Sequence, residues 1–214
     1  VYFTSLSDIK NVLGIDKYLH QEGLAHRFMP VEAVGYYKDA GGVYVDGSYE
    51  LLMADDIRWG NLNDPDVAID PESRRSVLYV KQAYMRLARV LLSKGDKEAA
   101  VAVLDKCIEF FPNDKDPYDI LMLSYPEIYY AAGATEKGDE FMKTLLENST
   151  DNLRYYYDLD PQFILYYTDG IYENMAIMDN MIDIATRFKR NELRTQITKA
   201  LNEENSKFYP YLVR

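Results

Sequence analysis

The chain is poor in the residues that most often build metal centres and active sites. Cys107 is the only cysteine among 214 residues, so an internal disulfide and a cysteine-based metal site are excluded. His20 and His26 are the only histidines, and their spacing matches no metalloenzyme motif. Neither GxSxG nor GxGxxG occurs, and Gly138 is followed by Asp139 where a phosphate-binding loop has lysine. We therefore expect no catalytic residue, metal or cofactor in this chain.

Long apolar runs and positive charge are also scarce. No apolar stretch reaches the ~18 residues that suggest a membrane-spanning helix. The formal net charge of −11 argues against nucleic acid or anionic lipid as a partner, because phosphate binding requires clustered Lys and Arg. The chain begins with Val1 and shows no signal peptide. We therefore expect it to be part of a longer polypeptide whose targeting segment lies upstream.

Pairs of aspartates separated by one residue occur three times. In some glycosyltransferases such a pair holds the metal of a nucleotide sugar, because two carboxylates can share one hard cation. Each pair in this chain borders a proline, which favours turn and helix-capping roles instead. We predict no metal ligand among them. The pairs are Asp64/Asp66, Asp114/Asp116 and Asp158/Asp160.

Residues 1–75 carry the pattern of a small α/β module. Two β-prone segments, 1–4 and 24–29, flank an amphipathic stretch at 11–21. A strand, a helix and a second strand in so few residues predict a βαβ unit with a parallel strand pair. An extended piece and a further helix are expected after these, at 43–45 and 48–58.

Residues 76–214 are predicted to be helical and to form about three tetratricopeptide-like hairpins. The tetratricopeptide pattern runs Trp-x2-Leu-Gly-x2-Tyr, then Ala-x3-Phe, then Pro, over about 34 residues. Small Ala88 and Ala100 allow two helices to approach closely, and Gly95 suits the turn between them. The residues that match the pattern are Tyr84, Leu87, Ala88, Leu91, Gly95, Ala100, Leu104, Cys107 and Pro112.

Two further hairpins follow more loosely. In the second hairpin Pro126 stands where a small residue should pack, so its first helix must begin late or kink. The third is predicted from apolar periodicity over 171–185 and 193–201. The residues that match the pattern in the second hairpin are Met122, Tyr125, Tyr129, Gly133, Gly138, Met142 and Leu145.

Tyrosine is abundant, with 20 residues against one Trp and eight Phe. Its apolar ring and polar tip suit protein interfaces and sugar-facing surfaces. Tyr155, Tyr156 and Tyr157 fall in a stretch, 148–170, that we predict to be a long loop. These three residues are candidate binding residues, although they also suit a simple packing role.

A second candidate surface surrounds Trp59. Arg58 precedes it, and Arg74 and Arg75 follow the same polar turn. Such a set is able to stack on a sugar or grip a carboxylate. The alternative is that Trp59 packs the N-terminal module onto the first repeat helix while the later arginines pair with aspartates. Those aspartates would be Asp64 or Asp70.

Three short strings, at 21–30, 58–65 and 74–75, precede the helical repeat. In this order they resemble the soluble C-terminal region of polytopic membrane proteins from Bacteroidetes that are related to protein O-mannosyltransferase-like glycosyltransferases. The resemblance implies that transferase chemistry lies in an N-terminal membrane portion and that this chain is an accessory domain on the periplasmic or extracytoplasmic face. His26 stands where the family's string has Tyr, which is a departure from its pattern.

The sequence therefore predicts a non-catalytic protein-interaction or assembly module, the soluble accessory domain of a membrane glycosyltransferase-like protein. Its partner would be another protein or the membrane portion of the same protein. The alternative is a carbohydrate-binding domain that presents glycan or acceptor to the membrane transferase. In that alternative, Trp59 and Tyr155 to Tyr157 stack on sugar rings.

Overall fold

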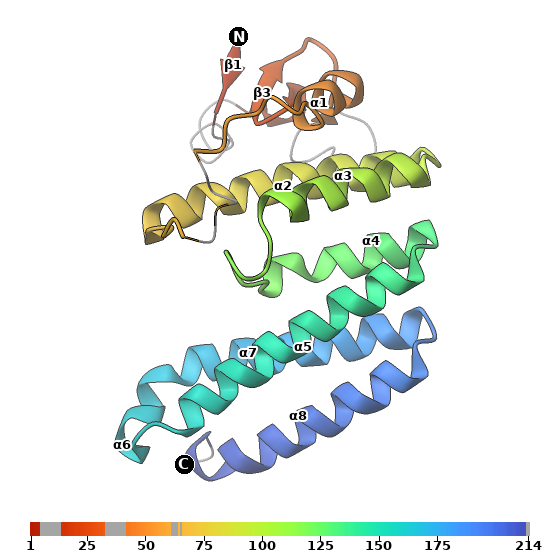
Figure 1. Ribbon diagram of the computed structural model, residues 1–214. Coiled ribbons are helices and arrows are strands. Elements are labelled where there is room, and N and C mark those ends of the chain that lie inside the picture. Colours follow the sequence, from red (N-terminus) through yellow and green to blue (C-terminus); the bar gives the residue numbers. More distant parts are fainter. Residues whose placement is uncertain (5–13, 33–41, 61–63, 65, 213–214) are drawn as a thin grey trace. The chain divides into compact units, whose positions relative to one another are not determined.

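The computed structural model describes residues 1–4, 14–32, 42–60, 64 and 66–212 and is mainly helical, with a small sheet near the N-terminus (Figure 1). The predicted fold class, helical hairpins preceded by a small α/β module, is confirmed. The chain divides into two compact units, 1–116 and 117–214. The predicted domain boundary between residues 75 and 76 remains a prediction.

The sheet belongs to the N-terminal unit. Its described strands are β1 (Tyr2–Phe3), β2 (Leu19–Glu22), β3 (Ala25–Phe28) and β4 (Gly42–Val43), in the order β1-β3-β2-β4. β3 pairs antiparallel with both β1 and β2, whereas β2 and β4 are parallel. The extended piece expected at 43–45 corresponds to β4 and is shifted by one or two residues.

The predicted βαβ unit is wrong in two respects. The first strand, β1, pairs with β3 antiparallel rather than parallel. The helix predicted over 11–21 is a strand from Leu19 onward, after a short 3-10 turn at Asp16–Tyr18, and residues 11–13 lie outside the described residues. The physical reason is Gly23, whose φ of +63° permits a tight hairpin between β2 and β3. Burial also alternates along β2, which is the period of a strand.

Helix α1 (Val45–Leu52) follows the sheet, so the helix predicted at 48–58 begins three residues earlier and ends six residues sooner than expected. Two hydrogen bonds join this module to the next helix. The amide nitrogen of the Gln21 side chain donates to the Ala83 carbonyl at 2.9 Å, and the Tyr84 hydroxyl donates to the Leu52 carbonyl at 2.8 Å. Both bonds are buried, so the α/β module is fixed to α2.

Helices α2 (Pro71–Ser93) and α3 (Lys97–Phe110) form the first predicted hairpin. The Asp70 carboxylate caps α2 by accepting from the backbone N–H groups of Glu72 and Ser73 at 3.0 and 3.1 Å. Gly95, with φ of +87°, provides the turn. The pattern residues Tyr84, Leu87, Ala88, Ala100, Leu104 and Cys107 are fully buried.

The C-terminal unit contains two further hairpins (Figure 1). A 3-10 turn at Ile120–Leu123 leads into α4 (Ser124–Ala132), whose late start places Pro126 in the first turn, as predicted. Gly133, with φ of +94°, ends α4 before α5 (Thr135–Tyr157). Helices α7 (Thr168–Arg187) and α8 (Asn191–Leu212) form the predicted third hairpin. None of the helices in the described part of the chain combines the length and apolar character needed to cross a bilayer.

The long loop predicted over 148–170 is wrong. Helix α5 continues to Tyr157, and α6 (Pro161–Ile164) with a 3-10 turn (Leu165–Tyr167) leads directly into α7. Helix α5 continues this far because a row of buried side chains continues along one of its faces. Leu145, Leu146, Ser149 and Leu153 are all buried on one face, and tertiary burial outweighs the modest helix propensity of the surrounding Asn, Thr and Tyr residues.

Candidate functional site

Arg74, a candidate binding residue, is held by a buried carboxylate. Arg74 Nε lies 3.0 Å from Asp116 Oδ1, and Lys81 Nζ lies 2.6 Å from Asp116 Oδ2. The Lys81 and Asp116 side chains are each 5% exposed. Arg75 pairs instead with Glu72 at 3.3 Å on the helix surface. The two arginines therefore pair with residues other than the expected Asp64 or Asp70, and binding roles for Arg74 and Arg75 remain predictions.

Trp59 packs against the C-terminal end of α3. Its ring centroid lies 5.6 Å from that of Phe110 and 5.4 Å from that of Phe111, the latter edge-on. The indole is half-buried and its Nε1 atom is buried without a hydrogen-bond partner, whereas Arg58 beside it is exposed. The rings of the two phenylalanines cover part of the indole surface that a sugar would use. Roles for Trp59 and Arg58 in binding remain predictions.

The aspartate pairs have local structural roles. Asp64 accepts from the Asp66 backbone N–H at 3.0 Å in a turn, and Asp160 caps α6 by accepting from the Gln162 N–H at 3.2 Å. Asp116 is the buried partner of Lys81. Across the described residues, no group of three or more His, Cys, Asp or Glu side chains is placed to hold a metal ion.

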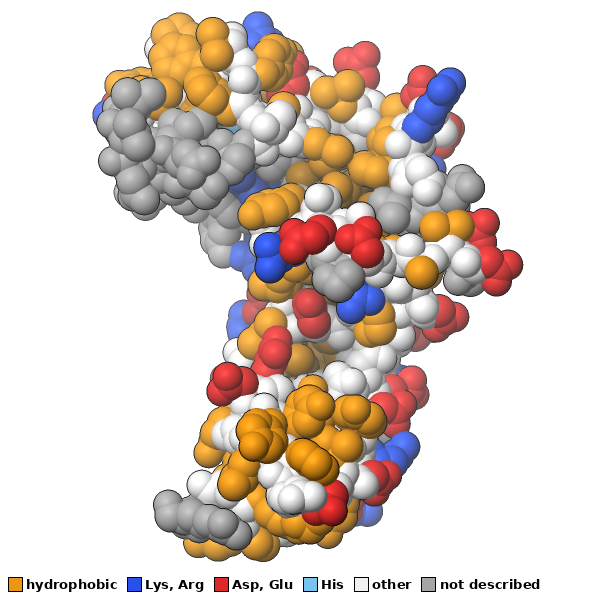
Figure 2. All heavy atoms as spheres, turned by 90° about the vertical axis from the view of Figure 1, so that its left-hand side faces the viewer, with side chains coloured by type: hydrophobic (Ala, Val, Ile, Leu, Met, Phe, Trp, Pro, Cys, Tyr) orange, Lys and Arg blue, Asp and Glu red, His pale blue; other side chains and the backbone are white. Residues whose placement is uncertain are grey.

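Aromatic side chains gather at one end of the C-terminal unit, where α5 ends and α7 begins. Tyr156 is stacked on Tyr167 with ring centroids 5.2 Å apart, and Tyr155 meets both rings edge-on at 5.7 and 6.4 Å. Phe163 lies 6.4 Å from Tyr166 in the next turn. We call these five residues the tyrosine surface. Figure 2 shows hydrophobic side chains gathered on this face of the C-terminal unit.

Exposure distinguishes the tyrosine surface from ordinary core. Tyr166 is 81% exposed, Tyr155 58% and Phe163 47%, whereas Tyr156 is half-buried beneath them. Of the three predicted residues, Tyr155 and Tyr156 belong to this surface. Tyr157 turns to α8, where its ring meets Phe208 edge-on at 5.8 Å. The sequence predicts these tyrosines to lie in a loop, whereas in the structure they lie at the C-terminal end of helix α5.

A glycine allows the surface to form. A Cβ atom on Gly170 would lie 2.7 Å from the Tyr156 hydroxyl oxygen and 3.0 Å from its ring, so Tyr156 can lie against α7 only because residue 170 has no side chain. Burial, assisted by the nearby Glu173 carboxylate, raises the pKa of the Tyr156 phenol. The phenol is therefore neutral at physiological pH.

Phe163, Tyr166 and Tyr167 are the members of the surface that the sequence analysis did not select as binding residues. Asp160 and Pro161 are a helix-start signal, and Phe163 and Tyr166 are then three residues apart on one face. That spacing was a usable signal, but the assumption of a long loop concealed it.

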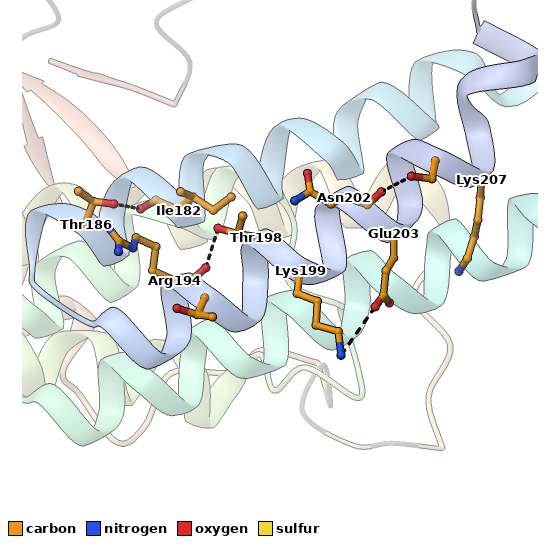
Figure 3. Close-up of a pocket in the computed structure, with 10 residues that line it drawn as sticks. Ile182, Thr186, Arg194, Thr198, Lys199, Asn202, Glu203 and Lys207 are labelled. Atoms are coloured by element: carbon orange, nitrogen blue, oxygen red, sulfur yellow. Dashed lines mark hydrogen bonds and ion pairs between the residues drawn. The ribbon is translucent and has the colours of Figure 1, made fainter.

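The open groove between α7 and α8, of about 1050 Å³, is less suited to a ligand (Figure 3). Its hydroxyl groups donate within their own helices: Thr186 to the Ile182 carbonyl and Thr198 to the Arg194 carbonyl, both at 2.8 Å. Lys199 faces Glu203 at 3.8 Å. Because these polar groups satisfy one another, the groove is the solvated outer face of a helical hairpin.

A family model of the tetratricopeptide repeat matches residues 81–114, which cover most of the α2–α3 hairpin. No curated protein and no solved structure matches the chain significantly. The chain therefore contains a tetratricopeptide-like repeat. Such repeats are as a rule non-catalytic and bind other proteins, which agrees with the predicted interaction module.

Proposed function

We propose that the chain is a protein-interaction and assembly module that docks a protein partner on the tyrosine surface. The observation that carries the proposal is the set of exposed aromatic rings near the end of α5 and in the turns before α7, with Tyr166 at 81% and Tyr155 at 58% exposure. Tyrosine is enriched at protein interfaces because its rigid ring gives contact area at low entropic cost. The tetratricopeptide-like hairpin supports the same class of function.

The proposed setting is the periplasmic or extracytoplasmic face of a membrane protein. The resemblance of the strings at 21–30 and 58–65 to the accessory region of membrane glycosyltransferase-like proteins supports this setting. In it, the partner is the membrane portion of the same protein or another envelope protein. The helical unit would then position that partner, and the chemistry would belong to the membrane portion.

A carbohydrate-binding role is the second candidate, and the exposure of Tyr166 favours it. A ring that is 81% exposed offers its faces to a sugar, and aromatic stacking is a common way to bind one. A glycan array with the purified chain tests this role. Binding of a defined glycan that is lost in Tyr166→Ala would establish it in place of protein docking.

The protein-docking proposal is tested by site-specific photo-crosslinking. A photoreactive phenylalanine is placed at position 166 of the intact protein, in cells of its source organism, and at position 79 as a control. Tyr79 is 70% exposed but lies on α2 of the other unit. We expect a discrete protein adduct at position 166 and none at position 79. Adducts that are absent at 166, or identical at both positions, would contradict the proposal.

A further inference from the structure

The tyrosine surface lies within a strongly acidic segment. Residues 151–173 contain five carboxylates and one arginine, Arg154. That arginine is already paired, since its Nη1 lies 2.9 Å from Asp151 Oδ1. All five carboxylate residues are exposed; they are Asp151, Asp158, Asp160, Asp169 and Glu173.

Helical spacing places several of these carboxylates beside the rings. Asp151 lies one turn before Tyr155 on α5, and Asp169 and Glu173 lie four residues apart on one face of α7. Asp158 and Asp160 form the link between Tyr157 and α6, which carries Phe163. Because Arg154 compensates Asp151 on α5, the negative charge that borders the aromatic surface lies on α7 and at the link between α5 and α6.

We propose that the tyrosine surface binds an arginine-rich segment of its protein partner. A guanidinium group is able to stack on a tyrosine ring and, at its edge, to donate two parallel hydrogen bonds to a carboxylate. Exposed rings with carboxylates beside them present both requirements at once. This inference rests on the proposed function and adds the chemistry of the partner.

Other occupants fit this surface less well. A neutral glycan can donate hydrogen bonds to the neighbouring carboxylates, but it carries no positive charge to compensate them. A second copy of the chain would bring two acidic segments together, and like charges facing each other across an interface oppose association. An anionic lipid surface would be repelled for the same reason.

The test is fluorescence anisotropy with three dye-labelled peptides of equal length, in which glycine alternates with arginine, lysine or glutamate. We expect the arginine peptide to bind several-fold more tightly than the lysine peptide, because only a guanidinium group both stacks on an aromatic ring and donates two parallel hydrogen bonds to a carboxylate. We expect the glutamate peptide not to bind. Binding of the arginine peptide should weaken as salt is raised.

Matched variants locate the binding. Tyr155→Ala with Tyr166→Ala should weaken the arginine peptide about tenfold, since two exposed cation–π contacts contribute about 0.5–1 kcal/mol each. Asp169→Asn with Glu173→Gln should weaken it about threefold and flatten the salt dependence. Tyr79→Ala and the charge-matched Asp179→Asn with Asp183→Asn, which alter exposed residues elsewhere, should change it less than about twofold.

Four outcomes would overturn the inference. If the surface variants and their controls weakened binding of the arginine peptide equally, the peptide would be attracted to the acidic protein as a whole rather than to the tyrosine surface. Equal affinity for all three peptides, or concentration-dependent dimerisation that Tyr166→Ala abolishes, would assign the surface to another occupant. A discrete photo-adduct at position 166 without arginine-peptide binding would overturn the partner chemistry and leave the docking function in place.

Discussion

Lys81 and Asp116 form a buried ion pair, with Nζ 2.6 Å from Oδ2 and each side chain 5% exposed. The pair joins the middle of α2 to the segment that follows α3, so it closes the first hairpin. Removing one member of a buried pair leaves the other charge uncompensated, which costs about 3–5 kcal/mol. Asp116→Ala should therefore lower the free energy of unfolding by about 3 kcal/mol, measured by urea denaturation.

The matched control is Asp55→Ala. Asp55 also pairs with a lysine, Lys106, at 3.0 Å, but its side chain is 95% exposed. An exposed pair contributes about 0–1 kcal/mol because water screens it. Equal losses for Asp116→Ala and Asp55→Ala would contradict the role given to the buried pair.

Gly138 allows the close approach of α4 and α5. A Cβ atom there would lie 2.5 Å from the ring of Tyr130, which is 8% exposed and has no room to retreat. Gly138→Ala gains about 1 kcal/mol of helix propensity but overpacks a buried ring, which costs about 1–3 kcal/mol. We expect a net loss of about 1 kcal/mol in urea denaturation.

A second substitution separates the steric clash from other effects of alanine. Tyr130→Leu removes the ring that the new methyl group would strike. Gly138→Ala should then cost less in the Tyr130→Leu background than alone, a coupling that a double-mutant cycle measures. Additive losses would show that the ring does not limit residue 138.

Much of the helical architecture follows from local patterns in the sequence. Asp70 before Pro71 marks a helix start, and Ala88, Gly95 and Ala100 mark a close helical hairpin, because each acts over one or two turns. Pro126 likewise indicates that α4 begins late. Here the interactions that decide the structure are local, so a single sequence reveals them.

The wrong predictions concern segments whose structure depends on contacts between residues far apart in the sequence. The strand at Leu19–Glu22 has one apolar residue, Leu19, whose spacing from Ile15 also fits a helix, and only its pairing with β3 across Gly23 resolves the choice. Tyr155 and Tyr167 meet only because α6 reverses the chain between them. No local spacing encodes that meeting, so the sequence named two residues of the tyrosine surface without predicting the surface.

Alkaline pH should destabilise the N-terminal unit through Tyr84. Burial raises the pKa of its phenol well above the usual range, and the hydroxyl donates to the Leu52 carbonyl at 2.8 Å. Below about pH 10 the folded and unfolded chains both keep this proton, so its contribution to stability is fully present. Above about pH 10 the unfolded chain releases the proton and the folded chain retains it, so stability falls as pH rises.

We expect the free energy of unfolding, measured by urea denaturation, to fall between pH 9 and pH 11 by up to about 1 kcal/mol per pH unit from this residue. Tyr84→Phe, although less stable at neutral pH, should show a shallower decline. A decline of the same slope in Tyr84→Phe would assign the alkaline sensitivity to other groups.

The tyrosine surface should contribute to binding and not to stability. Tyr166 is 81% exposed, and substitutions at such positions usually change the free energy of unfolding by less than about 0.5 kcal/mol. The Tyr155→Ala/Tyr166→Ala variant should therefore match the parent chain in far-UV circular dichroism and in its urea midpoint. A large loss of stability would show that the exposed rings hold the fold rather than a partner.

The most direct test of the account is the affinity of the intact protein for the partner that photo-crosslinking at position 166 identifies. Calorimetry or surface plasmon resonance would compare Tyr155→Ala/Tyr166→Ala with Tyr79→Ala, an equally folded variant at an exposed tyrosine in the other unit. The account predicts about tenfold weaker binding for the first variant, and unchanged binding for the second. Unchanged affinity in both variants would contradict it.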